Sequence, residues 1–292
     1  MSTRATQCGG RAAAVVDLVT GELDSLWVTE LLAGIERVAH ERGLGVAFNL
    51  VHGRATPGMD WLDSLAERGT AGIIAARTDL NAYQRRELAR RGIPAVLVDS
   101  ADHTDDALPS VTATSRHGAL TAVQHLAVLG HRRIAVIGGP SGSDLAGSLV
   151  AGYREALTVA GIPFDPTIVR ASGFRQEEGH RHAWSLLRGR TPPTAILTGS
   201  TMQALGVCKA ARESGVRVPD GLSVVGFDDL TDASWISPSL TTVRRPLRDM
   251  GAVAMRMVTT LMDGGDLTVT RARLATYLVV RHSTAPPRIP TR

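Results

Sequence analysis

The sequence contains little cysteine and lysine and no long apolar run, and each scarcity excludes a class of protein. Cys8 and Cys208 are the only two cysteines in 292 residues, too few for a disulfide framework, and neither has the CxxC partner of a structural metal site. Every apolar run is shorter than the ~18 residues that a membrane span requires, and residues 11–17 are too short for a secretory signal. We therefore expect a cytoplasmic protein with no metal site and no membrane partner.

Positive charge comes almost entirely from arginine, because Lys209 is the only lysine. The formal net charge of +4 is compatible with nucleic-acid binding but does not indicate it. Arginines gather in short segments such as residues 84–86 and 89–91, which are typical of solvated helix faces. Charge alone therefore favours no particular partner.

What the sequence does contain is a regular alternation of apolar, β-rich runs and helical segments. Its 43% apolar and 21% charged residues are typical of a globular protein, and its length corresponds to about two folding units of ~150 residues. Strands are expected at residues 13–19, 44–51, 71–75, 93–99, 110–113, 134–139, 168–170, 195–198, 222–229, 240–243 and 274–280. Helices are expected at residues 28–39, 59–68, 82–91, 117–129, 149–160, 176–187, 202–213 and 246–262.

The alternation runs twice, and this pattern is typical of parallel sheets covered by helices on both faces. The sequence therefore predicts an α/β protein with two similar, doubly wound parallel-sheet lobes. We assign residues 12–112 and 245–270 to the N-terminal lobe and residues 113–244 and 271–285 to the C-terminal lobe, with tails at 1–11 and 286–292. Ligands of such sheets bind at the carboxyl ends of the strands, so the polar residues that follow each strand are the candidates.

Several catalytic signatures are missing from the sequence. There is no GxGxxG after a strand, no phosphate-binding P-loop, no GxSxG elbow and no HExxH. His180 and His182 are two residues apart on an expected helix, which is a poor spacing for a metal pair. Asp228 and Asp229 close a strand, where adjacent side chains point in opposite directions. With no catalytic residue and no cofactor motif to assign, the sequence favours reversible binding over catalysis.

A resemblance to a known family runs through the second lobe. Residues 130–140 read Gly-His-Arg-Arg-Ile-Ala-Val-Ile-Gly-Gly-Pro, and residues 218–229 read Val-Pro-Asp-Gly-Leu-Ser-Val-Val-Gly-Phe-Asp-Asp. Pro-Ser-Leu-Thr-Thr-Val follows at residues 238–243, and Gly-Tyr-Arg-Glu-Ala-Leu stands at residues 152–157. In this order the segments resemble the lactose-repressor-type (LacI/GalR) transcription regulators, over residues 12–285.

The resemblance implies the effector-binding core of a repressor-type regulator, with the two-lobed fold of type I periplasmic sugar-binding proteins, and a homodimer as the usual assembly. The family reads operator DNA with an N-terminal helix-turn-helix region of ~60 residues. Only Met1 to Arg11 precede the first expected strand, which is too few for such a domain. We therefore expect operator binding only if a helix-turn-helix is present; a truncated chain and a stand-alone sensor are both open.

The resemblance also implies ligand contacts from the first lobe. Asp17, Asp24, Ser25 and Trp27 match the first strand–helix loop that touches the ligand in the family. The indole of Trp27 can lie against the apolar face of a sugar ring, or it can pack in the core. Asp24 can instead cap the helix. Arg77, after the third strand, either reaches the cleft between the lobes or lies in solvent.

In the second lobe, Asp228 matches the family acid that accepts hydrogen bonds from ligand hydroxyls, and Phe174 matches an aromatic residue that lines the same cleft. A structural carboxylate and a core residue are the respective alternatives. Ser200 and Thr201 stand where the family often has an Asn-Asp pair, and Leu149 stands where the family has a ligand-gripping arginine. These departures leave the identity of the sugar-like effector open.

The prediction is thus a non-enzymatic sensor of a small, sugar-like effector that controls DNA binding through a homodimer. A sugar-binding transport receptor is the alternative that the same fold permits, although the missing signal sequence argues against it. An enzyme that uses Asp228 or Asp229 is a further alternative, and it would turn its ligand over.

Overall fold

The computed structural model describes residues 14–21, 26–51, 60–100, 108–230 and 232–288 of the chain. These residues form two compact units, each built on its own sheet. The first unit comprises the described residues up to Val111 together with Arg248–Ala272. The second comprises Thr112–Leu247 and the described residues from Arg273 onward. None of the helices in the described part of the chain is both long and apolar enough to cross a membrane.

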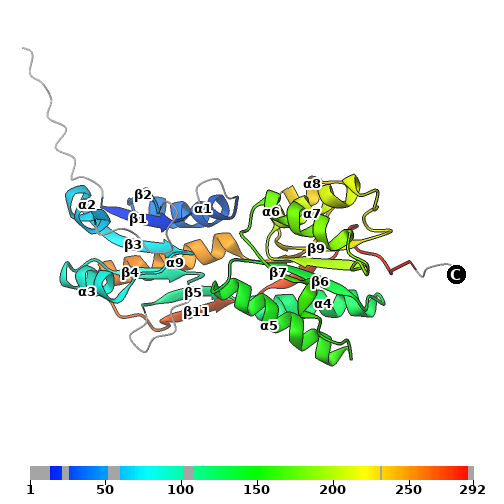
Figure 1. Ribbon diagram of the computed structural model, residues 1–292. Helices are drawn as coiled ribbons and strands as arrows, with labels where there is room; N and C mark the ends of the chain where they lie inside the picture. The colour runs from blue at the N-terminus through cyan, green and yellow to red at the C-terminus, as the bar shows by residue number, and fades with distance from the viewer. Residues whose placement is uncertain (1–13, 22–25, 52–59, 101–107, 231, 289–292) are drawn as a thin grey trace, which may run out of the picture. The chain divides into compact units, whose positions relative to one another are not determined.

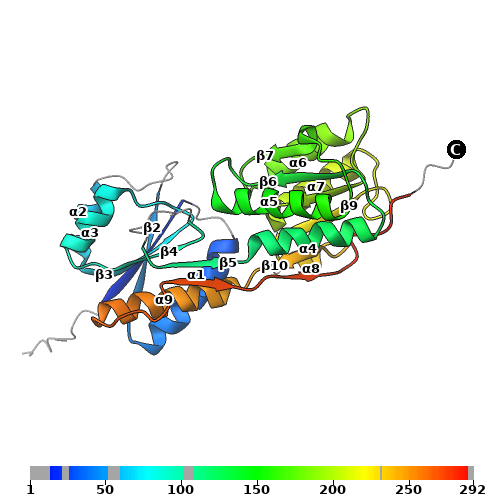
Figure 2. The same cartoon turned by 90° about the horizontal axis from the view of Figure 1, so that it is seen from below.

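The first sheet has six strands in the order β11-β5-β4-β3-β1-β2. The neighbours of β1, and the pairs β3–β4 and β4–β5, are parallel. The helices α1 and α9 lie on one face of this sheet, and α2 and α3 on the other (Figures 1 and 2). The strands are β1 (Val15–Thr20), β2 (Gly45–Leu50), β3 (Thr70–Ala76), β4 (Ala95–Val98), β5 (Ser110–Ala113) and β11 (Arg271–Leu274). The helices are α1 (Leu26–Glu41), α2 (Asp60–Arg68), α3 (Ala82–Arg90) and α9 (Leu247–Met262).

The second sheet repeats this plan in the order β12-β10-β9-β8-β6-β7, and only β12 pairs in the antiparallel sense among its described ladders. The pair α4 and α5 covers one face, and α6 and α7 cover the other (Figure 1). The strands are β6 (Ile134–Gly138), β7 (Val169–Ala171), β8 (Ala195–Thr198), β9 (Ser223–Asp228), β10 (Thr241–Arg244) and β12 (Tyr277–Val279). The helices are α4 (Ser115–Val128), α5 (Asp144–Val159), α6 (Gln176–Leu187), α7 (Thr201–Glu213), α8 (Asp232–Trp235) and a 3-10 turn at Pro166–Ile168.

The predicted doubly wound α/β architecture is confirmed, although individual elements differ; α8 and the 3-10 turn, for example, add to the expected helices. The single strand expected at residues 274–280 is wrong, because β11 and β12 belong to different sheets. Thr276, between them, is held by Thr114: its backbone N–H donates to Thr114 Oγ1 at 2.9 Å and its hydroxyl donates to Thr114 O at 3.0 Å. Helix α5 begins earlier than expected, because the Ser143 side chain accepts a hydrogen bond from the Ala146 N–H and caps it.

Two contacts of α5 stabilise the second unit: close packing against α4 and a buried hydrogen bond to β6. A Cβ on Gly152 of α5 would lie 2.1 Å from the carbonyl oxygen of Arg116, so only glycine allows α4 and α5 to approach this closely. The next residue, Tyr153, is buried in the core, and its hydroxyl donates to the carbonyl of Ile134 in β6 at 2.8 Å. Burial raises the pKa of that hydroxyl to about 12.

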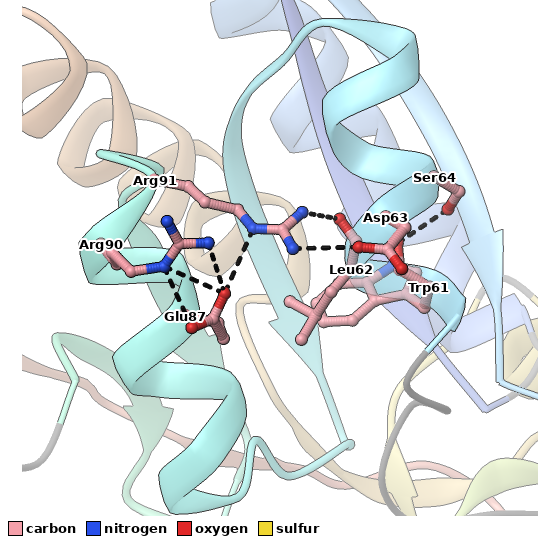
Figure 3. Close-up of polar contacts among 7 residues, drawn as sticks. All are labelled: Trp61, Leu62, Asp63, Ser64, Glu87, Arg90 and Arg91. Carbon is pink, nitrogen blue, oxygen red and sulfur yellow. Dashed lines mark hydrogen bonds and ion pairs between the residues drawn. The ribbon is translucent and has the colours of Figure 1, made fainter.

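The arginine-rich segment at the end of α3 is partly a solvated face and partly a link to α2 (Figure 3). Arg90 is exposed and pairs with Glu87 at 2.9 Å, which lowers the pKa of the Glu87 carboxyl. Arg91 reaches across to α2, where Nη1 donates to Leu62 O at 2.5 Å and Nη2 lies 3.0 Å from Asp63 Oδ1. These contacts hold α2 against α3 on the face of the first sheet that these two helices cover.

Candidate functional site

The carboxyl ends of β1, β3 and β4 bring together three side chains of the first unit, which we call the Trp27 cluster: Trp27, Arg77 and Asp99. Trp27 lies on the first turn of α1, the helix that follows β1, and is 1% exposed. The guanidinium of Arg77, directly after β3, lies 3.9 Å from the centre of the Trp27 indole, within cation–π range. Asp99, directly after β4, pairs with Arg77 at 3.8 Å. The indole N–H of Trp27 is buried and has no hydrogen-bond partner among the described residues.

Backbone conformation marks the same place. Arg77 has φ 50° and Asp99 has φ 52°, in the left-handed region that residues with a side chain rarely adopt. Such conformations persist where the surrounding structure imposes them, and they concentrate at binding sites. Both residues leave a parallel strand at the same edge of the sheet, so the turn that each makes directs its side chain across that edge.

Of the other predicted residues in the first unit, Asp17 does not join the Trp27 cluster. Its side chain is fully buried within β1, where it accepts hydrogen bonds from Asn49 Nδ2 at 2.6 Å and from the Thr70 hydroxyl. Arg68, at the end of α2, lies 3.6 Å from the same carboxylate. These three partners tie β1 to β2 and β3, which is a structural task. The predicted ligand residues at positions 24 and 25 lie outside the described residues.

In the second unit a half-buried aromatic side chain, Phe174, lies at the strand ends, in the turn between β7 and α6. Its half-buried ring lies on two backbones: a Cβ on Gly139 would come within 2.3 Å of the ring, and one on Gly199 within 3.3 Å. Gly139 follows β6 and Gly199 follows β8. A side chain at Gly139 would therefore displace the ring, and one at Gly199 would crowd it.

Ser200 and Thr201, predicted as ligand residues, already use their hydroxyls within the protein. The Ser200 hydroxyl donates to Phe174 O at 2.8 Å and accepts from the Gln203 N–H, which makes it the N-cap of α7. The Thr201 hydroxyl, fully buried, donates to Phe227 O at 2.7 Å. Both residues thus shape the strand end next to Phe174.

Asp228, at the end of β9, is brought to the same edge of the sheet and is paired with an arginine that the sequence analysis did not single out. Its side chain is 1% exposed, and Oδ1 lies 3.1 Å from Nη1 of Arg245, whose side chain is fully buried. Asp228 has φ 80°. Asp229, with φ 55°, pairs with different arginines: Arg281 at 2.7 Å and Arg244. Arg245 follows directly after Arg244, so the sequence offered no signal that only one of the two is buried.

Leu149 shows what replaces the arginine of the family pattern. It is fully buried in the hydrophobic core of the second unit, and Phe174 packs against that core. Leu149 Cδ2 lies 3.5 Å from the position of a Cβ on Gly138. Leu149 therefore packs against the end of β6 and offers no cationic donor. The buried guanidinium that pairs with Asp228 in this unit belongs to Arg245.

The chemistry available at these strand ends is that of recognition. The groups are an aromatic face on glycine backbones, a carboxylate–guanidinium pair, and an indole stacked by a second guanidinium. His180 bonds Glu213 on the helix pair α6–α7, away from them. Within the described ranges, no group of three or more His, Cys, Asp or Glu side chains could hold a metal ion.

Comparisons with known proteins identify the family and the fold. Residues 123–284 match the periplasmic binding protein-like domain. The chain is 35% identical over 296 residues to an uncharacterized HTH-type transcriptional regulator from the aml 5′ region of Streptomyces limosus, covering 97% of this chain and 82% of that one. It superposes on the regulator CelR in complex with cellobiose with a TM-score of 0.85 and 27% identity, covering 92% of this chain and 84% of that chain. It also superposes on the lac repressor dimer bound to operator and the anti-inducer ONPF, with a TM-score of 0.81 and 27% identity, covering 94% of this chain and 96% of that chain.

The fold and the family match together define a protein of the periplasmic-binding-protein-like class. Within that class, the chain belongs to the LacI/GalR family of transcriptional regulators. The relatives are regulators, and the transport-receptor alternative is not favoured.

Proposed function

We propose that this chain senses a small, sugar-like effector, which it binds reversibly and does not turn over, and that it acts in the cytoplasm, where operator DNA is. The observation that carries the proposal is the half-buried Phe174 ring on Gly139 and Gly199, at the same edge of the sheet as the buried Asp228–Arg245 pair at the end of β9. An aromatic face against the apolar face of a sugar, next to a carboxylate that accepts hydroxyl hydrogens, is a combination suited to polyols.

The first unit supports the same effector class. The buried Trp27 N–H is a donor with no protein partner among the described residues, and the Arg77 guanidinium covers the indole. CelR, a relative of similar fold, has been solved with cellobiose. The effector then controls transcription by favouring the conformation to which it binds more tightly. The change in the equilibrium between the two conformations is set by the difference in the effector's affinity for them.

Isothermal titration of the purified chain with a panel of pentoses, hexoses and disaccharides, cellobiose included, tests the proposal. We expect one or more members to bind with a saturable isotherm, and we expect the sugar to be recovered unchanged by chromatography. Phe174→Ala should weaken that binding, while Phe164→Ala, at an exposed position after α5, is the matched control and should not. Chemical conversion of the sugar, or equal affinity in both variants, would reject the assignment.

We further propose that the active form is a homodimer, and that operator DNA is its partner where a helix-turn-helix is present. The structural likeness to the lac repressor dimer supports this assembly. Trp235 on α8 is 80% exposed and is a candidate contact with the second copy. Sedimentation equilibrium should give twice the mass of the chain, and Trp235→Ala should shift the protein toward monomer; a monomeric wild-type protein would refute the assembly.

A further inference from the structure

Gln203, on the first turn of α7, is fully buried and uses both ends of its side-chain amide. Its Nε2 group donates to Gly138 O at 2.9 Å and to Gly173 O at 2.6 Å, and it lies 3.3 Å from Ser172 Oγ. Its Oε1 atom accepts from the Gly199 N–H at 2.9 Å. One side chain therefore joins the last residue of β6 to the segments that follow β7 and β8.

These partners surround Phe174 in the chain and in space. Gly173 precedes it directly, Gly138 precedes the Gly139 backbone on which the ring rests, and Gly199 is the second glycine under the ring. Burial of an amide is costly unless its hydrogen-bonding groups are satisfied, and a satisfied network permits few alternative geometries. The Gln203 amide thus fixes the distance between the ring and its two supporting backbones.

We infer that Gln203 is a positioning residue for the Phe174 ring, the proposed contact with the effector. Gln203 does not touch the effector itself but sets the position and tilt of that ring. The inference rests on the proposed function for its biological meaning, because Phe174 is the proposed contact with the sugar face. The claim that the Gln203 amide sets the position of the Phe174 ring can be tested without any ligand. A merely structural glutamine would hold the whole unit equally and would not act on Phe174 in particular.

The chain has only four phenylalanines, so a spectrum of protein labelled with ¹³C in the phenylalanine rings isolates this ring without a ligand. Gln203→Met keeps the length of the side chain and removes its two donors and its strong acceptor. We expect the Phe174 signals to move and broaden while those of Phe227, in the core of the same unit, stay in place. Gln124→Met on α4 is the matched control and should leave all four rings unchanged.

A second substitution covers the case in which Gln203→Met does not fold. Gln203→Asn keeps the amide but shortens the side chain, so that it cannot reach Gly138 and Gly173 at once, and Phe174 should shift here too. Gly139→Ala, which forces the ring from its backbone support, supplies the reference spectrum of a displaced Phe174. Unmoved Phe174 signals in a folded Gln203 variant would overturn the inference. So would loss of the native Phe227 signal in both Gln203 variants, because Gln203 would then be a general folding determinant.

Titration with the sugar that binds the wild-type chain separates this inference from the proposed function. A displaced ring should weaken the affinity of Gln203→Met about two- to tenfold, the range expected for one aromatic contact. If no sugar binds the wild-type chain, the proposed function fails, while the ring spectra still decide the role of Gln203. If a sugar binds the wild-type chain and a Gln203 variant with a displaced ring equally, positioning by Gln203 has no effect on recognition, and the inference is wrong.

Discussion

Replacement of Arg245 by methionine tests whether the Asp228–Arg245 pair holds the strand ends of the second unit. The two side chains are 0% and 1% exposed, and Nη1 and Oδ1 are 3.1 Å apart. At that separation and an effective dielectric constant of ~20, the attraction between unit charges is about 5 kcal/mol. Loss of one partner of a buried pair leaves the other charge uncompensated, which typically costs about 3–5 kcal/mol. We therefore expect Arg245→Met to lower the free energy of unfolding by about 3–5 kcal/mol.

The neighbouring arginine provides the control for this experiment. Arg244 also pairs with an aspartate, but its side chain is 44% exposed, and Arg281 lies 2.7 Å from the same Asp229. The Asp229 side chain is 2% exposed, but it keeps Arg281 as a partner when Arg244 is replaced, so Arg244→Met should cost only about 1 kcal/mol. Both variants can be compared by urea denaturation followed by circular dichroism, which gives each free energy of unfolding.

A double substitution separates the charge from the packing. Asp228→Asn in the Arg245→Met background removes the uncompensated charge, so the double variant should be more stable than Arg245→Met alone. Equal losses for Arg245→Met and Arg244→Met would refute the reasoning, because burial would then make no difference to the value of the pair. A double variant no more stable than the single one would show that Arg245 acts by packing alone.

Three further predictions concern stability. Tyr153→Phe should cost about 1 kcal/mol in urea denaturation, because the Ile134 carbonyl loses its 2.8 Å donor; an unchanged midpoint would contradict this. Gly152→Ala should cost about 1–3 kcal/mol and lower the Tm in calorimetry, since its Cβ would lie 2.1 Å from Arg116 O, and an unchanged Tm would argue against such close packing. Burial lowers the pKa of His131, so the unfolded chain binds more protons below pH ~6.5, and stability should fall as the pH drops from 6.5 toward the folded pKa. His131→Asn should reduce that fall in urea denaturation at a series of pH values, and an identical pH profile would exclude His131 as its source.

Periodicity was sufficient to predict most strands of the two sheets, although not the separation of β11 from β12. Parallel strands place the residues after them at one edge, so the place of Arg77 follows from the strand assignments, whereas Phe174 and Asp228 were selected through the family resemblance. The local turn chemistry of Ser200 could also be predicted, because serine before a helical run is a common N-cap.

What sequence could not predict is how the polar groups pair. Arg244 and Arg245 are adjacent and chemically identical, yet one is exposed and the other fully buried, because strand β10 ends between them. Gln203 looks like an ordinary helix residue, and its contacts come from segments 30 and 65 positions away. Asp17 matched a ligand position, but its carboxylate accepts hydrogen bonds from Asn49 and Thr70 on the neighbouring strands β2 and β3. Each outcome depends on contacts between distant segments, which no local pattern contains.

Contact between the effector and Phe174 can be observed in the ring spectrum of ¹³C-phenylalanine-labelled protein during titration with the first sugar that gives a saturable isotherm. We expect the Phe174 signals to shift in proportion to occupancy while the signals of Phe227, in the core of the same unit, do not move. Saturable binding that leaves the Phe174 signals unchanged would show that the effector binds elsewhere and that Phe174 is not its contact.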